Sequence, residues 1–242
     1  MLKQFFAAAA LCVFVLPAIA QNAVSPDTTG NTPADKAVSY YYNFIDNQSR
    51  LYNGNEHLGY SQRITGFAYF GENNWQTGTV LYDGLVFKNV PMLFDLYKDL
   101  VIVRHFNEYL KIALISPKVK SFTIADHHFI RIVQDSLTNP LLKTGFYDVL
   151  YDGNLTCLAR RTKIIEETVT DHLEQEFVEK NFYYIKKNGV FKAVKSYKGL
   201  LEILKEHGKE IRRYLKKNKI KFRKNKETAI VTAVSYYDSP KN

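Results

Sequence analysis

The sequence predicts an α+β protein in which a large, curved antiparallel β-sheet of the meander type is followed by C-terminal helices. Two observations predict this class. Between residues 64 and 163, short runs of β-branched, aromatic and aliphatic residues alternate with turn residues, which is typical of strands joined by local hairpins. After Ser196, apolar residues recur with helical spacing instead. We therefore expect the helices to be segregated at the C-terminal end of the chain.

The first twenty residues are typical of a cleavable secretory signal. Lys3 precedes an apolar run over residues 5–16, and the small residues Ala18 and Ala20 form a cleavage site. The run is too short for a membrane anchor, which needs about 20 apolar residues. We therefore expect export, with a mature chain that begins at Gln21 and has no transmembrane segment. Its expected location is the periplasm, the outer membrane surface or the medium.

The mature chain divides into three parts. Residues 21–35 are polar and lack periodicity, so they predict a flexible leader. Residues 36–195 form the expected antiparallel β domain, which a short aromatic helix over about 37–46 precedes. Residues 196–242 form a basic helical segment packed on that domain.

Three dipeptides predict hairpins within the β domain. Asp83-Gly84 and Asp152-Gly153 lie between strand-like runs, and Asp-Gly at such a place favours a type I′ turn with positive φ at both residues. Asn188-Gly189 is flanked in the same way. The acidic segment 166–180 predicts a short helix or a covering loop. Further strands are expected at 100–103, 110–114 and 128–133.

Helical signals begin at Ser196, a predicted N-cap. Apolar residues at 197, 200, 201 and 204 follow helical spacing, and Gly208 is expected to end this first helix. A second helix over about 209–217 has two distinct faces, and a third is expected around 229–237. At about 100° per residue, the second helix carries Ile211, Tyr214 and Leu215 on its apolar side. Its basic residues lie opposite, namely Lys209, Arg212, Arg213, Lys216 and Lys217.

Charge is unevenly distributed along the chain. Residues 180–242 hold 18 Lys and Arg against five Asp and Glu, whereas residues 21–179 hold 14 against 19. This asymmetry predicts an anionic partner, either a lipid, a lipopolysaccharide or an acidic protein surface, and export argues against nucleic acid. Two alternatives for the five cations stay open. They are solvated on a helix that packs through its apolar side, or they pair with the acidic residues of 166–179.

The sequence carries no motif that identifies a catalytic centre or a cofactor site, so we assign no catalytic, cofactor-binding or metal-binding residue. Asp126-His127-His128 is the most metal-like cluster. Neighbouring residues of a strand point to opposite faces, so surface or hydrogen-bonded histidines account for it more simply. Cys157 is the single cysteine left after signal cleavage, and its apolar neighbours predict a buried thiol.

The order of motifs resembles a large group of exported, signal-peptide-bearing proteins of Bacteroidota-type bacteria. The resemblance implies a location and a bacterial source, and it implies no activity. Asp-Thr-Thr at Thr28 and Asp-Ser-Leu at Ser136 are similar to the glycosylation sites of such proteins. The stretches that carry the resemblance are 51–54, 75–84, 90–99, 146–153, 183–191 and 222–238.

The predicted function is that of an exported, non-enzymatic binding or scaffolding protein of the cell envelope. One alternative is a periplasmic carrier of a lipid-like or other apolar ligand, because the early aromatic residues could line a pocket. The same residues could instead fill the core of the sheet. A second alternative is a hydrolase whose active site is dispersed in sequence.

Overall fold

The computed structural model describes residues 33–34, 36–38, 40, 50–137, 140–169 and 171–239. The chain divides into two compact units, residues 1–40 and 41–242. The described residues of the first unit are helical, so helical backbone begins before the expected helix over 37–46. The signal segment, most of the leader and Thr28 lie outside the described residues.

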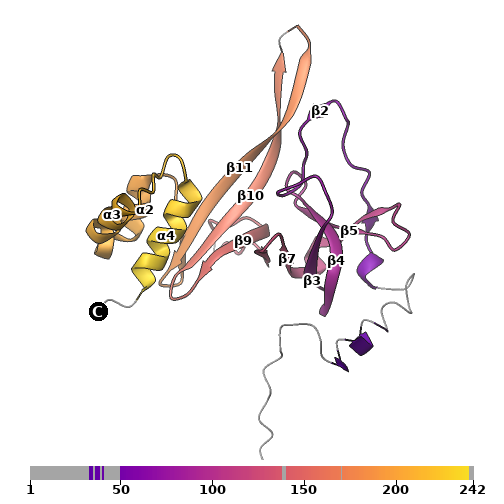
Figure 1. Ribbon diagram of the computed structural model, residues 1–242, viewed down its shortest axis with the longest axis horizontal. Helices are drawn as coiled ribbons and strands as arrows, with labels where there is room; N and C mark the ends of the chain where they lie inside the picture. Colours follow the sequence, from indigo (N-terminus) through magenta and orange to yellow (C-terminus); the bar gives the residue numbers. More distant parts are fainter. Residues whose placement is uncertain are drawn as a thin grey trace, which may run out of the picture. The chain divides into compact units, whose positions relative to one another are not determined.

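Within the described residues, twelve strands of the second unit form one sheet that is antiparallel except for the pairing of β2 with β11 (Figure 1). The α+β class is therefore confirmed. The spatial order is β1-β6-β5-β4-β3-β7-β8-β9-β10-β11-β12, so two meanders meet where β3 pairs with β7. The strands are β1 (Asn55–Glu56), β2 (Ile64–Thr65), β3 (Gln76–Tyr82), β4 (Leu85–Asp95), β5 (Leu100–Arg104), β6 (Lys111–Ala113), β7 (Val119–Ile124), β8 (His127–Ile132), β9 (Gly145–Asp152), β10 (Thr156–Val169), β11 (Leu173–Lys187) and β12 (Val190–Ala193).

Two of the three predicted hairpins have the expected turn. Asp83 and Gly84 have φ of 50° and 79°, and Asn188 and Gly189 have φ of 50° and 80°. In both hairpins the flanking strand residues pair directly across the two-residue loop. Positive φ at both central residues is the property that these dipeptides supply.

The third hairpin has a different turn from the one predicted. Asp152 pairs with Thr156, which leaves a three-residue loop, and neither Asp152 nor Gly153 has positive φ. The reason is a tertiary contact with Asp238. Its carboxylate accepts hydrogen bonds from the backbone N–H of Asn154 at 2.7 Å and from the Tyr151 hydroxyl at 2.9 Å. A residue more than 80 positions away therefore organises this turn.

The prediction of a helix or loop over 166–180 is wrong, because residues 166–169 of β10 and 173–180 of β11 lie in a paired hairpin. β9 pairs with only residues 156–159 of β10, so the β10–β11 hairpin extends beyond the neighbouring strand (Figure 1). Its outer part is mostly exposed, and the alternation of polar and apolar residues that marks a half-buried strand is therefore missing there. Cross-strand polar contacts support the pairing, including Lys180 to Glu166 at 2.7 Å.

The C-terminal segment is helical as predicted. Ser196 caps the first helix, since its Oγ accepts a hydrogen bond from the backbone N–H of Gly199 at 3.1 Å. Gly208 does not end this helix. It has φ of −58° and is the first residue of the next helix, because the buried Leu204 ends the first helix and a short 3-10 turn follows. The helical elements are η2 (Arg50–Tyr52), η3 (Ser116–Lys118), α2 (Tyr197–Ile203), η4 (Lys205–His207), α3 (Gly208–Lys217) and α4 (Lys226–Asp238).

Two large apolar clusters lie on one face of the sheet. The ring cluster of Phe94, Phe122, Phe129 and Phe146 has centroid distances of 4.8–5.9 Å. The helix-covered cluster joins α2, α3 and α4 to β9, β10 and β11. Ala159, Asp148 and Phe129 lie directly opposite one another on β10, β9 and β8, and cross-strand partners point to the same face. Both clusters therefore share a face, and smaller clusters cover the other.

Gly78 of β3 leads to a stability prediction. A Cβ at this position would overlap the backbone oxygen of Thr123 on β7 and lie 3.2 Å from Met92 Sδ. We expect Gly78→Ala to lower the free energy of unfolding by about 2–3 kcal/mol, since overpacking a rigid sheet forces the backbone apart. Gly199→Ala is the control, because a Cβ there meets only Ser196 Oγ at 3.5 Å. The control should stabilise the protein by about 0.5–1 kcal/mol. Urea unfolding measures both, and equal effects would contradict the register of β3 and β7.

Candidate functional site

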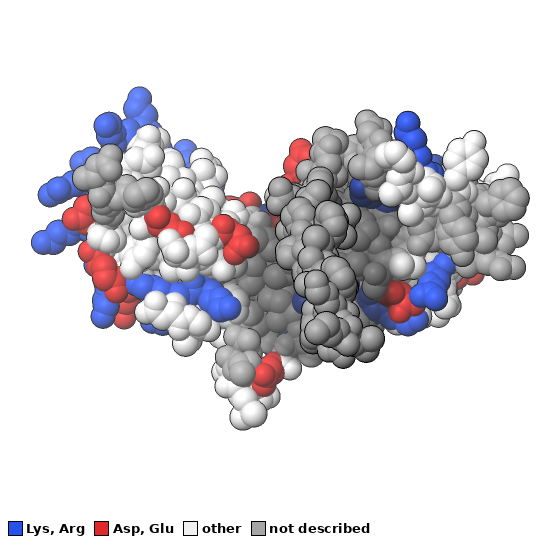
Figure 2. Space-filling view, turned by 90° about the horizontal axis from the view of Figure 1, so that it is seen from below, with Lys and Arg blue, Asp and Glu red and all other residues white. Residues whose placement is uncertain are grey.

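The five predicted basic residues form one exposed face on α3, which we call the basic face. Opposite it, Ile211 and Leu215 are buried in the helix-covered cluster, as the helical pattern predicted. Tyr214 differs from the prediction, because it is exposed and stacks on Tyr236 with ring centroids 4.5 Å apart. Figure 2 shows Lys and Arg side chains over the part of the molecule that carries these helices, with Asp and Glu side chains among them.

Three of the five acidic residues of the helical segment are bound to groups of the sheet. Glu206 Oε2 accepts a hydrogen bond from Lys187 Nζ of β11 at 2.5 Å, which lowers the pKa of this carboxyl to about 2. Glu227 and Asp238 bind Arg161 and Tyr151 of the sheet. None of the five residues of the basic face forms an ion pair within the described part of the chain. Three of the five acidic residues of the segment therefore bind the sheet, whereas Glu202 and Glu210 are exposed beside the cations.

The acidic residues on the outer β10–β11 hairpin do not neutralise this face in the described structure. Glu166 pairs with Lys180 on the adjacent strand, and Glu167 accepts a hydrogen bond from Gln175 at 2.7 Å. Like charges spaced i,i+4 on α3, such as Lys209 and Arg213, cost about 0.2–0.5 kcal/mol per pair in an isolated helix. An anion placed against the face would remove this repulsion.

Part of the basic face lines a hollow of about 440 Å³, which we call the basic hollow. Lys205 was not predicted to join these cations, because the first helix was expected to extend to Gly208. The 3-10 turn η4 instead places Lys205 beside the first two turns of α3. Lys216 and Lys217 lie outside the hollow. Its lining residues are Leu201, Lys205, Gly208, Lys209, Arg212 and Arg213.

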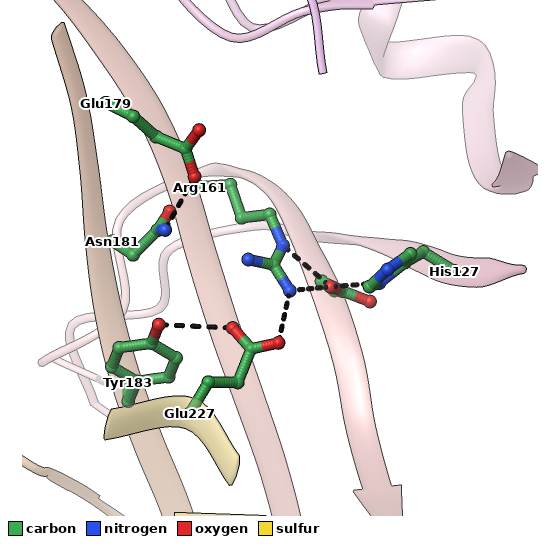
Figure 3. A network of polar contacts seen from close by, with 7 residues as sticks. His127, Arg161, Glu179, Asn181, Tyr183 and Glu227 are labelled. Atoms are coloured by element: carbon green, nitrogen blue, oxygen red, sulfur yellow. Dashed lines mark hydrogen bonds and ion pairs between the residues drawn. The ribbon is translucent and has the colours of Figure 1, made fainter. Parts of the chain in front are cut away.

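A buried ion-pair network holds the helical segment on the sheet (Figure 3). Arg161 of β10 lies on the same strand face as Ala159 and Cys157, at the junction of the ring cluster and the helix-covered cluster. Its Nε donates to Asp148 Oδ2 of β9 at 2.7 Å. Its Nη2 donates to Glu227 Oε1 of α4 at 3.0 Å. Sheet and helix are therefore joined through one guanidinium group.

Further contacts surround this guanidinium. The Tyr183 hydroxyl of β11 donates to Glu227 Oε2 at 3.1 Å, and the Phe70 ring lies 5.4 Å from the guanidinium carbon. Burial alone would lower the pKa of Arg161, but its hydrogen bond to Glu227 and the charge of Asp148 outweigh burial and raise this pKa. Burial and the charge of Glu227 raise the pKa of Tyr183. The network therefore holds a charged arginine and a neutral tyrosine.

His127 completes the network at the surface. Its Nδ1 lies 2.7 Å from Asp148 Oδ2, whereas its neighbour His128 is exposed. Asp148 also bonds Arg161, so the His127–Asp148 pair shares its negative charge with a guanidinium. Among the described residues, no hydroxyl or thiol forms a hydrogen bond with His127, and no three candidate ligands cluster as a metal site requires. The geometry identifies His127 as a hydrogen-bonded histidine of the network.

A second polar cluster lies around the fully buried Asp95, the last residue of β4. The Tyr60 hydroxyl donates to Asp95 Oδ2 at 2.5 Å, and His57 Nε2 lies 3.7 Å from the same oxygen. His57 also lines a hollow of about 410 Å³ together with Lys98. The sequence did not indicate this cluster, because His57 and Asp95 are far apart along the chain and neither belongs to a motif.

Cys157 and Ser136 are the two remaining residues that the sequence pattern singled out. Cys157 is buried, as predicted, and burial raises the pKa of its thiol to about 12, so the thiolate that reacts or binds metals does not form near neutral pH. Ser136, which resembles a glycosylation site, is exposed on the loop after β8.

No family model, no curated protein and no solved structure matches this chain. Among the residues that the structure describes, no helix has both the length and the apolar character needed to cross a membrane.

The ion-pair network gives a prediction about Glu227. We expect Glu227→Ala to lower the free energy of unfolding by about 2 kcal/mol, because it removes two charge-assisted hydrogen bonds and leaves Arg161 with one acidic partner. Glu210→Ala is the matched control, since Glu210 is exposed on α3 and forms no ion pair in the described residues. The control should change stability by less than about 0.5 kcal/mol. Urea unfolding measures both, and indistinguishable variants would show that the network does not hold the helices.

The Asp95 cluster predicts a pH dependence. Burial lowers the pKa of His57 below its ordinary value of 6.5, Asp95 opposes this, and Lys98 and Lys111 add to it. The unfolded chain therefore binds more protons than the folded chain below about pH 6.5, and the stability due to His57 is lost as the pH falls. Histidine ring signals in an NMR titration should give His57 a midpoint below its ordinary value of 6.5. A midpoint at or above that value would contradict the burial of His57 beside Asp95.

Proposed function

We propose that this protein is an exported, non-enzymatic binding module of the cell envelope, which docks on an anionic envelope component through its basic face. The observation that carries the proposal is the separation of charge in the helical segment. Three acidic residues of that segment bind groups of the sheet, and the five cations of the basic face have no ion-pair partner among the described residues.

The environment of the basic face supports surface attachment. Its five cations lie on a helix that packs in the helix-covered cluster, and the segment is bound to the sheet by Glu206 just before α3 and by Asp238 at the end of α4. A rigid cationic face loses little conformational freedom on binding. Each Lys or Arg near an anionic membrane contributes about 1 kcal/mol. Lipid and lipopolysaccharide share phosphate groups as their negative charges, so both fit the same face.

The two alternatives have less support in the described structure. For a carrier, the ring cluster would have to leave space for a ligand, yet its phenylalanine rings contact one another and are buried. For a hydrolase, His127 and Asp148 would supply a base, yet Arg161 shares the aspartate. We therefore retain the binding module as the proposed function.

Vesicle binding tests the proposal. We expect the protein to sediment with vesicles that contain phosphatidylglycerol and to stay in solution with vesicles of phosphatidylcholine alone. Replacing Arg212, Lys216 and Lys217 with Gln should weaken binding roughly a hundredfold, as three surface cations imply. In 1 M salt, where the Debye length is about 3 Å, binding should be lost.

The control variant removes three exposed cations of the β domain, with Gln at Lys120, Lys143 and Lys192. It has the same net charge as the helix variant, so an equal loss of binding would contradict a specific face. The intact mass of protein purified from the exporting cell tests the remaining claims. A mass corresponding to residues 21–242 supports export, and extra mass released by denaturation would favour the carrier.

A further inference from the structure

We propose that the basic hollow of α2, η4 and α3 is a binding site for a phosphomonoester, a dianionic phosphate group attached to an organic substituent. The inference rests on the proposed function and names the group that the basic face recognises. It assigns distinct roles to the cations of α3, because some line the hollow and others lie outside it.

The side chains of four cations line the basic hollow. Lys205 comes from η4, and Lys209, Arg212 and Arg213 come from the first two turns of α3. All four are exposed, and within the described residues none of them has an acidic partner. Four like charges around a hollow repel one another unless an anion lies between them. The arrangement is therefore that of a site complementary to negative charge.

The type of cation indicates the type of anion. Two of the four side chains are arginines, whose planar guanidinium groups bind phosphate or carboxylate oxygens in pairs. A carboxylate carries one negative charge, whereas a phosphomonoester carries nearly two at neutral pH. The higher charge fits four cations better than the lower one. α3 also begins in the hollow at Gly208, and the positive end of a helix favours anions further.

The size and floor of the hollow indicate that the phosphate has a substituent. Its volume of about 440 Å³ lies within the range of small-molecule sites. Leu201 contributes an apolar surface next to the cations. A phosphomonoester places its charged group against the cations and its organic group against such a surface. A lipid headgroup and a water-soluble phosphate ester both have this chemistry.

Gly208 provides a way to test the hollow without changing its cations. Its φ of −58° is helical, and an added Cβ would lie 3.5 Å from the Leu201 oxygen, which is an ordinary contact. Gly208→Ala should therefore fold and bind normally. Gly208→Glu adds a carboxylate at the hollow, and an acidic residue in the first turn of a helix is favourable for folding. This variant should keep its stability and lose phosphate binding.

The experiment is calorimetric titration of the purified protein with inorganic phosphate and, separately, with a monomeric short-chain phosphatidic acid. We expect saturable binding of both. Lys209→Gln combined with Arg212→Gln should weaken it about a hundredfold, at about tenfold for each charged hydrogen-bonding group. Lys216→Gln combined with Lys217→Gln removes the same charge from the same helix outside the hollow. This pair should change affinity less than about threefold, because neither side chain lines the hollow.

The two ligands distinguish the sources of the phosphate. Tighter binding of phosphatidic acid than of inorganic phosphate supports an organic substituent and indicates a lipid headgroup, whereas equal affinities would overturn the substituent and indicate a free phosphate. Equal losses in the two double variants, or full binding by Gly208→Glu, would overturn the site. If vesicle binding persists although the site is overturned, the basic face acts as a diffuse cationic surface. The proposed function then holds without a phosphate site. Absence of both phosphate and vesicle binding would overturn both proposals.

Discussion

The attachment of the helical segment depends on one charged side chain at the junction of two apolar clusters. Arg161 is buried, so its charge is tolerated only because Asp148 and Glu227 lie within hydrogen-bonding distance. Asp148 belongs to the sheet and Glu227 to the first turn of α4. This requirement links the position of α4 to the sheet, and with it that of α3, which packs against α4 in the same cluster.

The acidic residues that bind the sheet also affect which charges are exposed on the helical segment. Glu227 satisfies a buried arginine, Glu206 binds Lys187, and Asp238 shapes the loop after β9. These acidic groups are held close to the sheet and cannot also neutralise α3. The cations of α3 are then exposed on a rigid helix, and four cations converge around the basic hollow. The binding of these three acidic residues to the sheet therefore stabilises the segment and contributes to its exposed positive charge.

Local signals predicted the elements whose conformation depends on neighbouring residues. Asp83-Gly84 and Asn188-Gly189 form the predicted turns because their positive φ values are intrinsic to those residue types. Asp152-Gly153 does not, because Asp238 binds that loop. The acidic hairpin was not predicted, because its strands are exposed where no other layer covers them. Its pairing depends on cross-strand partners, which a pattern within one segment does not contain.

The sequence by itself determined the α+β class, the cap at Ser196, the burial of Cys157 and the two faces of α3. Each of these depends on residue type and on spacing within a few positions, which fixes backbone conformation and the direction of side chains. Only the tertiary structure decided that Arg161 meets Glu227 66 positions away, that His57 lies near Asp95, and that Lys205 joins Lys209 around one hollow. The first two contacts arise because burial requires a charge to find a partner wherever the fold places one. The third arises because the 3-10 turn η4 separates α2 from α3 and places Lys205 beside α3.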